Sequence, residues 1–452
     1  MEGSTGVPPR GFLAVCATQN DVGCRIVIVH TRSMPDKVIA IGLILPDLTR
    51  TVAEEHLEEL TKLIETAGGA IVHRVFAKRQ RPDPSTFIGS GKAEEVKSLA
   101  KKHAATLVVF DDDLSPAQVR NLEKIIEVPV IDRSGLILDI FARRARSRES
   151  RTQTELAKLE YMLPRLTRQW SHLSRQGAGA GAKRGVGETQ LEMDRRVVRT
   201  RISRLKDELR KVEKTRETQR KSRDTAFTVA LVGYTNAGKS TLFNRLTKGS
   251  AVAVDKLFAT LDAKSQRAAF ETPAETVIID TVGFIRKLPH HLVASFRSTM
   301  EEAVAADLVL HVIDASHPQF TEQHEIGQEV LNDLGVDPDR VVEVFNKVDR
   351  IEEHFMRPRR KGASIVSALT GDGIDNLIDT IRARERSGGE MMRIEIPHED
   401  SRAAAQLHDV AEVYDQKVTD RGTIFRAWVP NHAVHLFQAY SAEDLLETAE
   451  AK

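Results

Sequence analysis

A phosphate loop constrains this chain more than any other feature of its sequence. Residues 233–240 read Gly-Tyr-Thr-Asn-Ala-Gly-Lys-Ser and fit the pattern G-x-x-x-x-G-K-[ST]. An apolar run, Phe227–Val232, precedes the loop, and a helical pattern follows it. This context predicts that backbone N–H groups surround the α- and β-phosphates of a nucleotide. Lys239 would reach the β- and γ-phosphates, and the hydroxyl of Ser240 would bind Mg²⁺.

Two further segments have the spacing of nucleotide-sensing loops. Asp280-Thr281-Val282-Gly283 follows the strand-like run Val277–Ile279, so Asp280 is predicted to hold Mg²⁺ through water and the Gly283 amide to sense the γ-phosphate. Thr260 lies one switch-loop length after Ser240, and we expect it to bind Mg²⁺ directly. Residues 132–135 also fit D-x-x-G, but they precede the phosphate loop, and we interpret them as an ordinary turn.

The base-reading motif indicates guanine. Asn346-Lys347-Val348-Asp349 follows a predicted strand and looks like the guanine-reading motif of G proteins. A carboxylate accepts from the N1–H and N2–H₂ groups of guanine, and adenine offers no matching donors, so the wrong base would leave polar groups unpaired. Ser367-Ala368-Leu369 resembles the fifth G-protein element, whose backbone contacts the guanine O6.

We therefore predict Lys239, Thr260 and Gly283 as the catalytic residues. The predicted GTP-binding set comprises Gly233, Tyr234, Thr235, Asn236, Ala237, Gly238, Lys239, Ser240, Thr241, Phe258, Ala259, Thr260, Leu261, Asp262, Asp280, Thr281, Val282, Gly283, Asn346, Lys347, Val348, Asp349, Ser367, Ala368 and Leu369.

The residue after Gly283 is Phe284, where many small GTPases place a glutamine that orients water. A phenyl ring cannot orient water, so we expect slow intrinsic hydrolysis that a partner accelerates. Asn236 occupies a position that resembles the potassium-coordinating asparagine of some GTPases. Potassium stimulation is therefore a hypothesis, which equal rates in sodium and potassium buffers would remove.

The chain of 452 residues is too long for a single ordinary core. Strand and helix patterns alternate up to about Arg143 and again in residues 225–387, which predicts α/β folds with mostly parallel sheets, doubly wound in the second case. We expect four domains, in the ranges 1–145 (α/β), 146–224 (helical hairpin), 225–387 (G domain) and 388–452 (small α+β).

The predicted hairpin is strongly basic. Leucine-rich heptad seams over 156–173 and 191–212 flank a glycine-rich loop, which indicates two antiparallel helices, and Pro164 is expected to kink the first. Residues 143–224 contain 24 Lys/Arg and 11 Asp/Glu, a net of +13 in a chain whose net charge is +1. Such asymmetry indicates contact with a polyanion, and Arg175, Lys183 and Arg184 near the loop are the predicted RNA contacts.

Composition excludes several other classes. Two cysteines provide neither a disulfide framework nor a cysteine-based zinc site. No apolar run approaches the ~20 residues that a membrane helix needs, and the start of the chain is not a secretory signal. We expect a cytoplasmic protein that acts as a monomer.

Several runs, five of them outside the predicted G domain, make the chain resemble the HflX family of ribosome-associated GTPases. They are 87–92 (FIGSGK), 114–123 (LSPAQVRNLE), 136–142 (LILDIFA), 163–166 (LPRL), 187–192 (GETQLE) and 258–262 (FATLD). The resemblance implies an N-terminal α/β domain, a hairpin that enters a ribosomal RNA cavity, binding to the large ribosomal subunit, and a role in assembling ribosomes or in splitting and rescuing stalled ones. The chain departs from the family pattern at Val186 and Ala263, where prolines are usual.

Two alternatives remain open at this point. The chain would be an RNA-docking module in which GTP only stabilises one conformation, or an ATP-dependent RNA remodeller that uses its N-terminal domain. Gly89-Ser90-Gly91-Lys92 is only half a phosphate loop, and we interpret it as a turn that caps the helix from Ala93.

Overall fold

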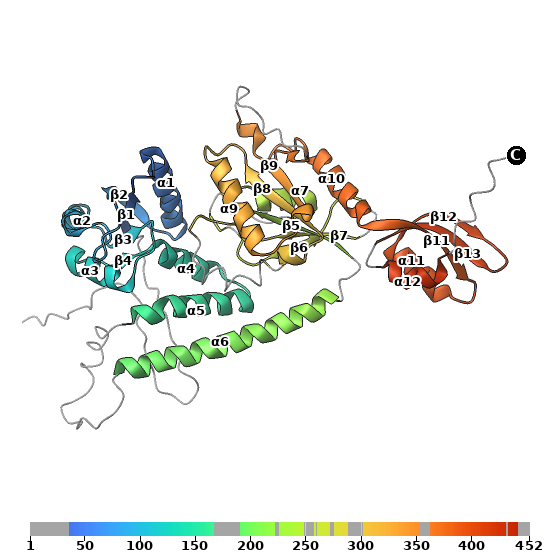
Figure 1. Cartoon of the computed structure of the whole chain (residues 1–452), viewed down its shortest axis with the longest axis horizontal. Helices are drawn as coiled ribbons and strands as arrows, with labels where there is room; N and C mark the ends of the chain where they lie inside the picture. Colours follow the sequence, from blue (N-terminus) through green and yellow to red (C-terminus); the bar gives the residue numbers. More distant parts are fainter. Residues whose placement is uncertain are drawn as a thin grey trace, which may run out of the picture. The chain divides into compact units, whose positions relative to one another are not determined.

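The computed structural model describes residues 36–166, 190–221, 226–247, 249, 257–258, 260–271, 275–287, 300, 302–351, 362–430 and 433–441 (Figure 1). The chain divides into two compact units, residues 1–143 with 158–198 and residues 144–157 with 199–452. This division crosses the predicted hairpin, and the four predicted domain ranges stay a prediction.

The first sheet is entirely parallel, with strand order β2-β1-β3-β4, as the alternating pattern predicts. Its elements are β1 (Lys37–Ile44), α1 (Arg50–Thr66), β2 (Ala70–Lys78), α2 (Ser90–His103), β3 (Leu107–Phe110), α3 (Pro116–Ile126) and β4 (Val130–Ile131).

Helix capping and apolar spacing explain where these helices form. Leu57, Leu60 and Leu63 share the buried face of α1, as their spacing predicts. Ser115 and Gln118 form a reciprocal capping box at the start of α3. Helix α2 begins at Ser90, three residues earlier than expected, and Gly89 adopts a left-handed φ of 84° before it.

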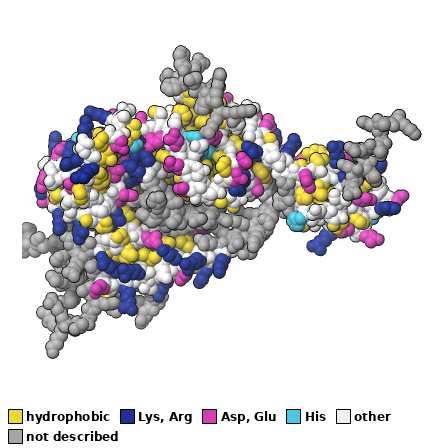
Figure 2. Space-filling model, in the orientation of Figure 1, with side chains coloured by type: hydrophobic (Ala, Val, Ile, Leu, Met, Phe, Trp, Pro, Cys, Tyr) yellow, Lys and Arg dark blue, Asp and Glu magenta, His cyan; other side chains and the backbone are white. Residues whose placement is uncertain are grey.

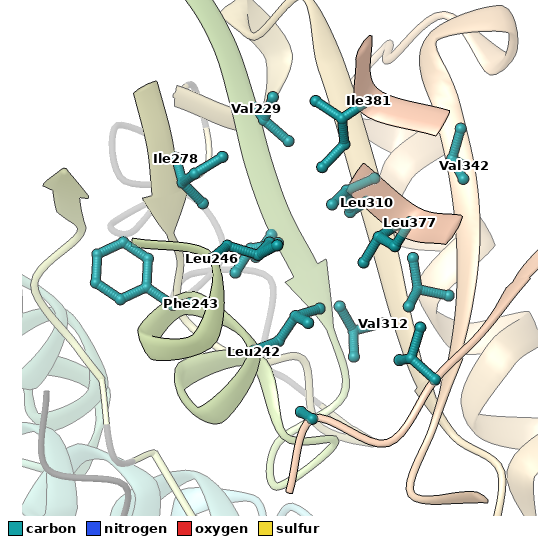
Figure 3. Close-up of a cluster of buried hydrophobic side chains, with 14 of the residues drawn as sticks. Val229, Leu242, Phe243, Leu246, Ile278, Leu310, Val312, Val342, Leu377 and Ile381 are labelled. Atoms are coloured by element: carbon teal, nitrogen blue, oxygen red, sulfur yellow. The ribbon is translucent and has the colours of Figure 1, made fainter. Parts of the chain in front are cut away.

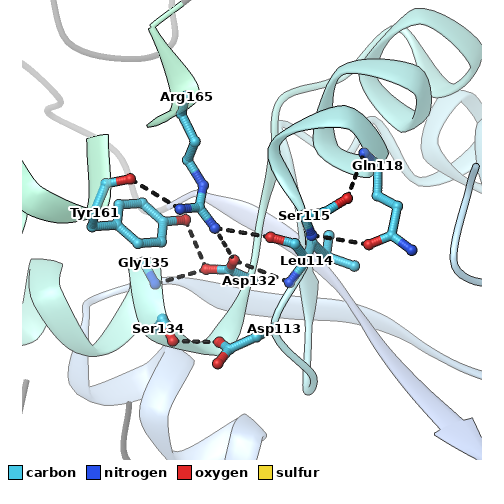
Figure 4. A network of polar contacts seen from close by, with 9 residues as sticks. All are labelled: Asp113, Leu114, Ser115, Gln118, Asp132, Ser134, Gly135, Tyr161 and Arg165. Carbon is cyan, nitrogen blue, oxygen red and sulfur yellow. Dashed lines mark hydrogen bonds and ion pairs between the residues drawn. The ribbon is translucent and has the colours of Figure 1, made fainter. Parts of the chain in front are cut away.

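The D-x-x-G segment at 132–135 is the start of a helix and not an ordinary turn. Helix α4 spans Arg133–Arg144, and Asp132 Oδ1 accepts from the Gly135 amide at 2.9 Å. Figure 4 shows the fully buried Asp132 carboxylate also accepting from Tyr161 Oη and from Arg165 Nη2, both at 2.7 Å. This residue therefore connects α4 to the end of the following helix.

The hairpin helices are α5 (Arg148–Met162) and α6 (Gln190–Lys221). Two ion pairs, Arg148 with Glu208 and Arg201 with Glu155, place the helices side by side and antiparallel, as predicted. Pro164 does not kink a continuing α-helix, because α5 has already ended and a 3₁₀ turn, Leu163–Arg165, follows. The glycine-rich loop with Arg175, Lys183 and Arg184 lies outside the described residues.

The second parallel sheet carries the phosphate loop and has strand order β10-β9-β8-β5-β7-β6, with only β6 antiparallel. Its elements are β5 (Phe227–Gly233), α7 (Lys239–Thr247), β6 (Lys264–Arg267), β7 (Thr276–Asp280), β8 (Leu308–Asp314), α9 (Phe320–Asp333), η4 (Pro338–Arg340), β9 (Val341–Asn346), η5 (Val348–Arg350), β10 (Ser364–Ile365) and α10 (Ile374–Ser387).

Figure 3 shows the core that holds this sheet in place. Apolar side chains of β5, β7, β8 and β9 pack against α7 and α10, with Leu242, Leu310 and Leu377 among the fully buried ones. Each fully buried leucine stabilises the fold by about 1.5–3 kcal/mol relative to an exposed one. The carboxyl ends of the parallel strands, where ligands bind in such sheets, are thereby fixed.

The last described part is a three-stranded antiparallel sheet, ordered β11-β13-β12, with a buried apolar core. Its elements are β11 (Gly389–Pro397), α11 (Ser401–Val410), β12 (Glu412–Val418), β13 (Gly422–Pro430), α12 (Val434–Phe437) and η6 (Gln438–Tyr440). This is the predicted α+β tail. Among the helices of the described residues, none combines the length and apolarity needed to span a bilayer.

Candidate functional site

The phosphate loop connects β5 to α7 in the conformation that its glycines permit. Gly233 has φ 144° and Gly238 has φ 94°. A Cβ on Gly233 would lie 2.1 Å from the Val312 carbonyl oxygen, and one on Gly238 would lie 2.2 Å from Asn346 Nδ2. Both positions therefore require glycine for conformational and steric reasons.

Lys239 is buried inside this loop. Its Nζ donates to the carbonyl oxygens of Gly233 at 3.0 Å and Tyr234 at 2.8 Å. Burial lowers the pKa of Lys239 to about 8, although the nearby Asp280 carboxylate opposes the shift. A negative phosphate beside this ammonium would favour its charged form and raise that pKa, so the loop is electrostatically suited to a polyphosphate.

Three predicted metal ligands from distant segments converge. Ser240 Oγ donates to Asp280 Oδ2 at 2.8 Å, Thr260 Oγ1 donates to the same oxygen at 2.9 Å, and the two hydroxyls are 3.0 Å apart. Asp280 Oδ1 is buried and has no hydrogen-bond partner among the described residues, and burial raises the pKa of this carboxyl group. These oxygen donors fit Mg²⁺, which prefers carboxylate, hydroxyl and water ligands.

The segment after Asp280 is tied to the phosphate loop by its backbone. The Phe284 amide donates to the Gly233 carbonyl oxygen at 2.9 Å, and the Thr235 amide donates to the Phe284 carbonyl oxygen at 2.7 Å. A Cβ on Gly283 would come within 2.8 Å of both Lys239 Nζ and Thr235 Cα, so only glycine fits beside the loop. The side chain of Phe284 is only 2% exposed and therefore has no access to an attacking water.

The predicted guanine-reading residues bridge three loops. Asn346 Nδ2 donates to the Ala237 carbonyl oxygen at 2.8 Å, and its Oδ1 accepts from the Ala368 amide at 2.9 Å. The Asp349 carboxylate is exposed, and its Oδ1 accepts from Ser367 Oγ at 2.6 Å. The phosphate loop, the base-reading motif and the fifth element are thus held in one hydrogen-bonded network.

Sequence reasoning missed two residues that position this network. Asp314, at the end of β8, accepts from Lys347 Nζ at 2.7 Å, and Arg245 of α7 donates to the carbonyl oxygen of Leu369 at 2.6 Å. A signal existed for Asp314, because it ends a buried strand that pairs with the strand ending at Asn346. No sequence signal existed for Arg245, because its partner lies 124 positions further along the sequence.

The remaining predicted residues have varied positions. Buried ones are Tyr234, Phe258, Leu261, Thr281 and Val282; Thr241 and Val348 are half-buried; and Asn236 is exposed. Ala259 lies outside the described residues. The carboxylate of Asp262 accepts hydrogen bonds from Arg146 and Ser147 at the start of α5. Taken together, the parallel sheet, the phosphate loop around Lys239, the convergence of the predicted metal ligands and the network around the predicted base-reading motif define a phosphate-loop GTPase domain.

Comparison with known proteins agrees with this class. Residues 54–142, 144–223 and 228–347 match family models described as GTP-binding GTPase N-terminal, GTP-binding GTPase middle region and 50S ribosome-binding GTPase. The chain belongs to the HflX family of GTPases, and as a member it binds and hydrolyses GTP.

Two relatives illustrate the similarity. GTPase HflX of Magnetococcus marinus is 43% identical over 395 residues, covering 86% of this chain and 91% of the relative. GTPase HflX of Escherichia coli is 41% identical over 413 residues, covering 89% and 93%. A GTP-binding protein from Sulfolobus solfataricus, solved in complex with GDP, is 23% identical with a TM-score of 0.42 over 77% of this chain and 98% of that one.

Proposed function

We propose that this GTPase acts in the cytoplasm on the large ribosomal subunit, in ribosome assembly or in splitting and rescuing stalled ribosomes. The observation that supports this most is the charge of α6. Its exposed side chains include seven basic residues, Arg196, Arg199, Arg204, Lys206, Arg210, Lys211 and Lys214, against two acidic ones, Glu192 and Asp207, among the described positions. Figure 2 shows Lys and Arg side chains gathered along this helix on the face in view. Such a surface favours phosphate contacts with RNA.

In the proposed site, the loop amides and Lys239 hold the phosphates of GTP, and the Gly283 amide contacts the γ-phosphate. Ser240 and Thr260 would hold Mg²⁺ directly and Asp280 through water. The metal ion would neutralise negative charge on the β- and γ-phosphates. Asp349 selects guanine, and the Ser367–Leu369 backbone contacts O6 of the base.

The buried Phe284 supports slow intrinsic turnover. None of its atoms can orient water, so we propose that ribosome binding supplies or positions the missing group. Bound potassium beside Asn236 is a second candidate for supplying positive charge at the phosphates. Hydrolysis rates measured in potassium and in sodium buffer, with and without large subunits, separate these two contributions.

Sedimentation with purified large subunits tests the ribosomal role. We expect the protein to pellet with a non-hydrolysable GTP analogue and to pellet less with GDP. Replacing Arg199 and Arg204 by glutamate on α6 should weaken pelleting and flatten its salt dependence, because each lost phosphate contact lowers the slope by about one. Arg402→Glu on α11 is the matched control and should pellet like the wild type. Equal pelleting with all nucleotides, or none, would contradict the proposal.

A further inference from the structure

The segment that carries Thr260 is anchored to a helix outside the G domain. The carboxylate of Asp262, two residues later, accepts from Ser147 Oγ at 2.5 Å and from the backbone amides of Arg146 and Ser147 at 3.2 Å each. The intervening Leu261 is buried. Only one residue separates Thr260 from Asp262, so a displacement of Asp262 should be transmitted to Thr260.

The N-terminal end of α5 suits a negative charge. Ser147 caps the helix, since its Oγ also accepts from the Ser150 amide at 3.0 Å, and Ser150 is buried. The three hydrogen bonds from Arg146 and Ser147 hold the Asp262 carboxylate at the N-terminal, positive end of the helix dipole.

Helix α5 is itself joined to α6 by two ion pairs. Arg201 donates from Nε and Nη2 to the two carboxylate oxygens of Glu155, at 2.8 Å and 2.9 Å. Arg148, in the first turn of α5, donates to Glu208. A shift of α6 would consequently move the first turns of α5, and with them the partner of Asp262.

We propose that Asp262 is a positioning residue that links Thr260 to the start of α5, so that the rate of GTP hydrolysis depends on where the hairpin lies. The inference rests on the proposed role of Thr260 in the nucleotide site. Thr260 would respond to GTP and not to GDP, because the γ-phosphate that it would contact is present only in GTP. Loss of the anchor should therefore affect hydrolysis and GTP-analogue affinity while leaving GDP affinity alone.

A double-mutant cycle on the isolated full-length protein tests this link. Asp262→Ala, Ser147→Ala and the double variant are compared in single-turnover GTP hydrolysis and in titrations with GDP and GTPγS. We expect Asp262→Ala to slow hydrolysis by about tenfold or more, because three hydrogen bonds to a charged group are lost. Ser147→Ala should have a smaller effect, and the double variant should be no slower than Asp262→Ala. GDP affinity should change by less than about twofold.

Asp400→Ala is the matched control, because Asp400 also caps a helix, α11, by accepting from the Ala403 amide. It should hydrolyse GTP at the wild-type rate. Asp262→Asn keeps an acceptor without the charge, and together with Ser147→Ala it decides the question if Asp262→Ala does not fold.

Wild-type hydrolysis by these variants would overturn the proposal, as would additive effects in the cycle or an equal loss of GDP and GTPγS affinity. A protein that fails to pellet with ribosomes but shows the expected cycle would remove the ribosomal role and leave this inference standing.

Discussion

Replacing Asn346 by alanine tests whether one side chain holds the nucleotide site together. The amide of Asn346 is 1% exposed and makes one hydrogen bond to the phosphate loop, at Ala237, and one to the fifth element, at Ala368. The substitution leaves the Ala237 carbonyl and the Ala368 amide without this partner. It also opens space beside Gly238.

The expected magnitude follows from these two contacts. Each buried polar group left unsatisfied costs about 1–3 kcal/mol. We take about 2–4 kcal/mol for the pair, because water can reach part of an opened site. If this cost falls on the nucleotide-binding conformation, the dissociation constant for GDP rises between about 30-fold and about 900-fold.

Fluorescent GDP titration at fixed Mg²⁺ measures this change, and circular dichroism at the same temperature shows whether the variant is folded. Asn376→Ala, an exposed asparagine on α10, is the matched control and should bind GDP like the wild type. A folded Asn346→Ala protein with an unchanged GDP dissociation constant would refute the view that this side chain links the loops.

Three other predictions concern charged and titrating groups. The Lys239 pKa of about 8 should rise when phosphates bind, so GTP affinity should fall above pH 8. Calorimetry at pH 7 and pH 9 should show a decrease of about tenfold, and a GTP affinity that does not change between these two pH values would contradict the prediction. Burial, followed by His324, lowers the pKa of His311 to about 3, so the unfolded chain binds more protons between pH 6.5 and 3, and stability should fall by about 1.4 kcal/mol per pH unit on acidification. Denaturant titration should show a weaker dependence in His311→Asn. Arg165→Met removes the cation beside buried Asp132 and should destabilise the protein by about 3 kcal/mol in the same assay, and a loss below 0.5 kcal/mol would show that the pair contributes little.

Local patterns were sufficient for much of the fold and for the chemistry of single loops. The runs before Gly233 and Asn346 are buried strands because β-branched residues between turn signals favour that structure, and both loops follow their strands as expected. The spacing of Leu57, Leu60 and Leu63 predicted a helix face for the same reason.

Contacts between distant segments were beyond such reasoning. The bond from Ser147 to Asp262 joins residues 115 positions apart, and no periodicity encodes it. The role of Asp132 was misjudged because D-x-x-G specifies neither a turn nor a cap until its neighbours are placed. Pro164 was expected inside a helix, but the preceding helix ends first, since proline tolerates the first turn of a new 3₁₀ segment better than a helix interior.

The inward orientation of Phe284 limits how this enzyme could evolve faster turnover. A glutamine placed there would enter an apolar interior, where its amide would meet no water to orient and would cost about 1–3 kcal/mol if left unsatisfied. A glutamine at this position alone is therefore not expected to place its amide beside an attacking water. The backbone pairing of Phe284 with Gly233 and Thr235 fixes that inward orientation, so the proposed need for an external activator should persist when only this side chain is changed.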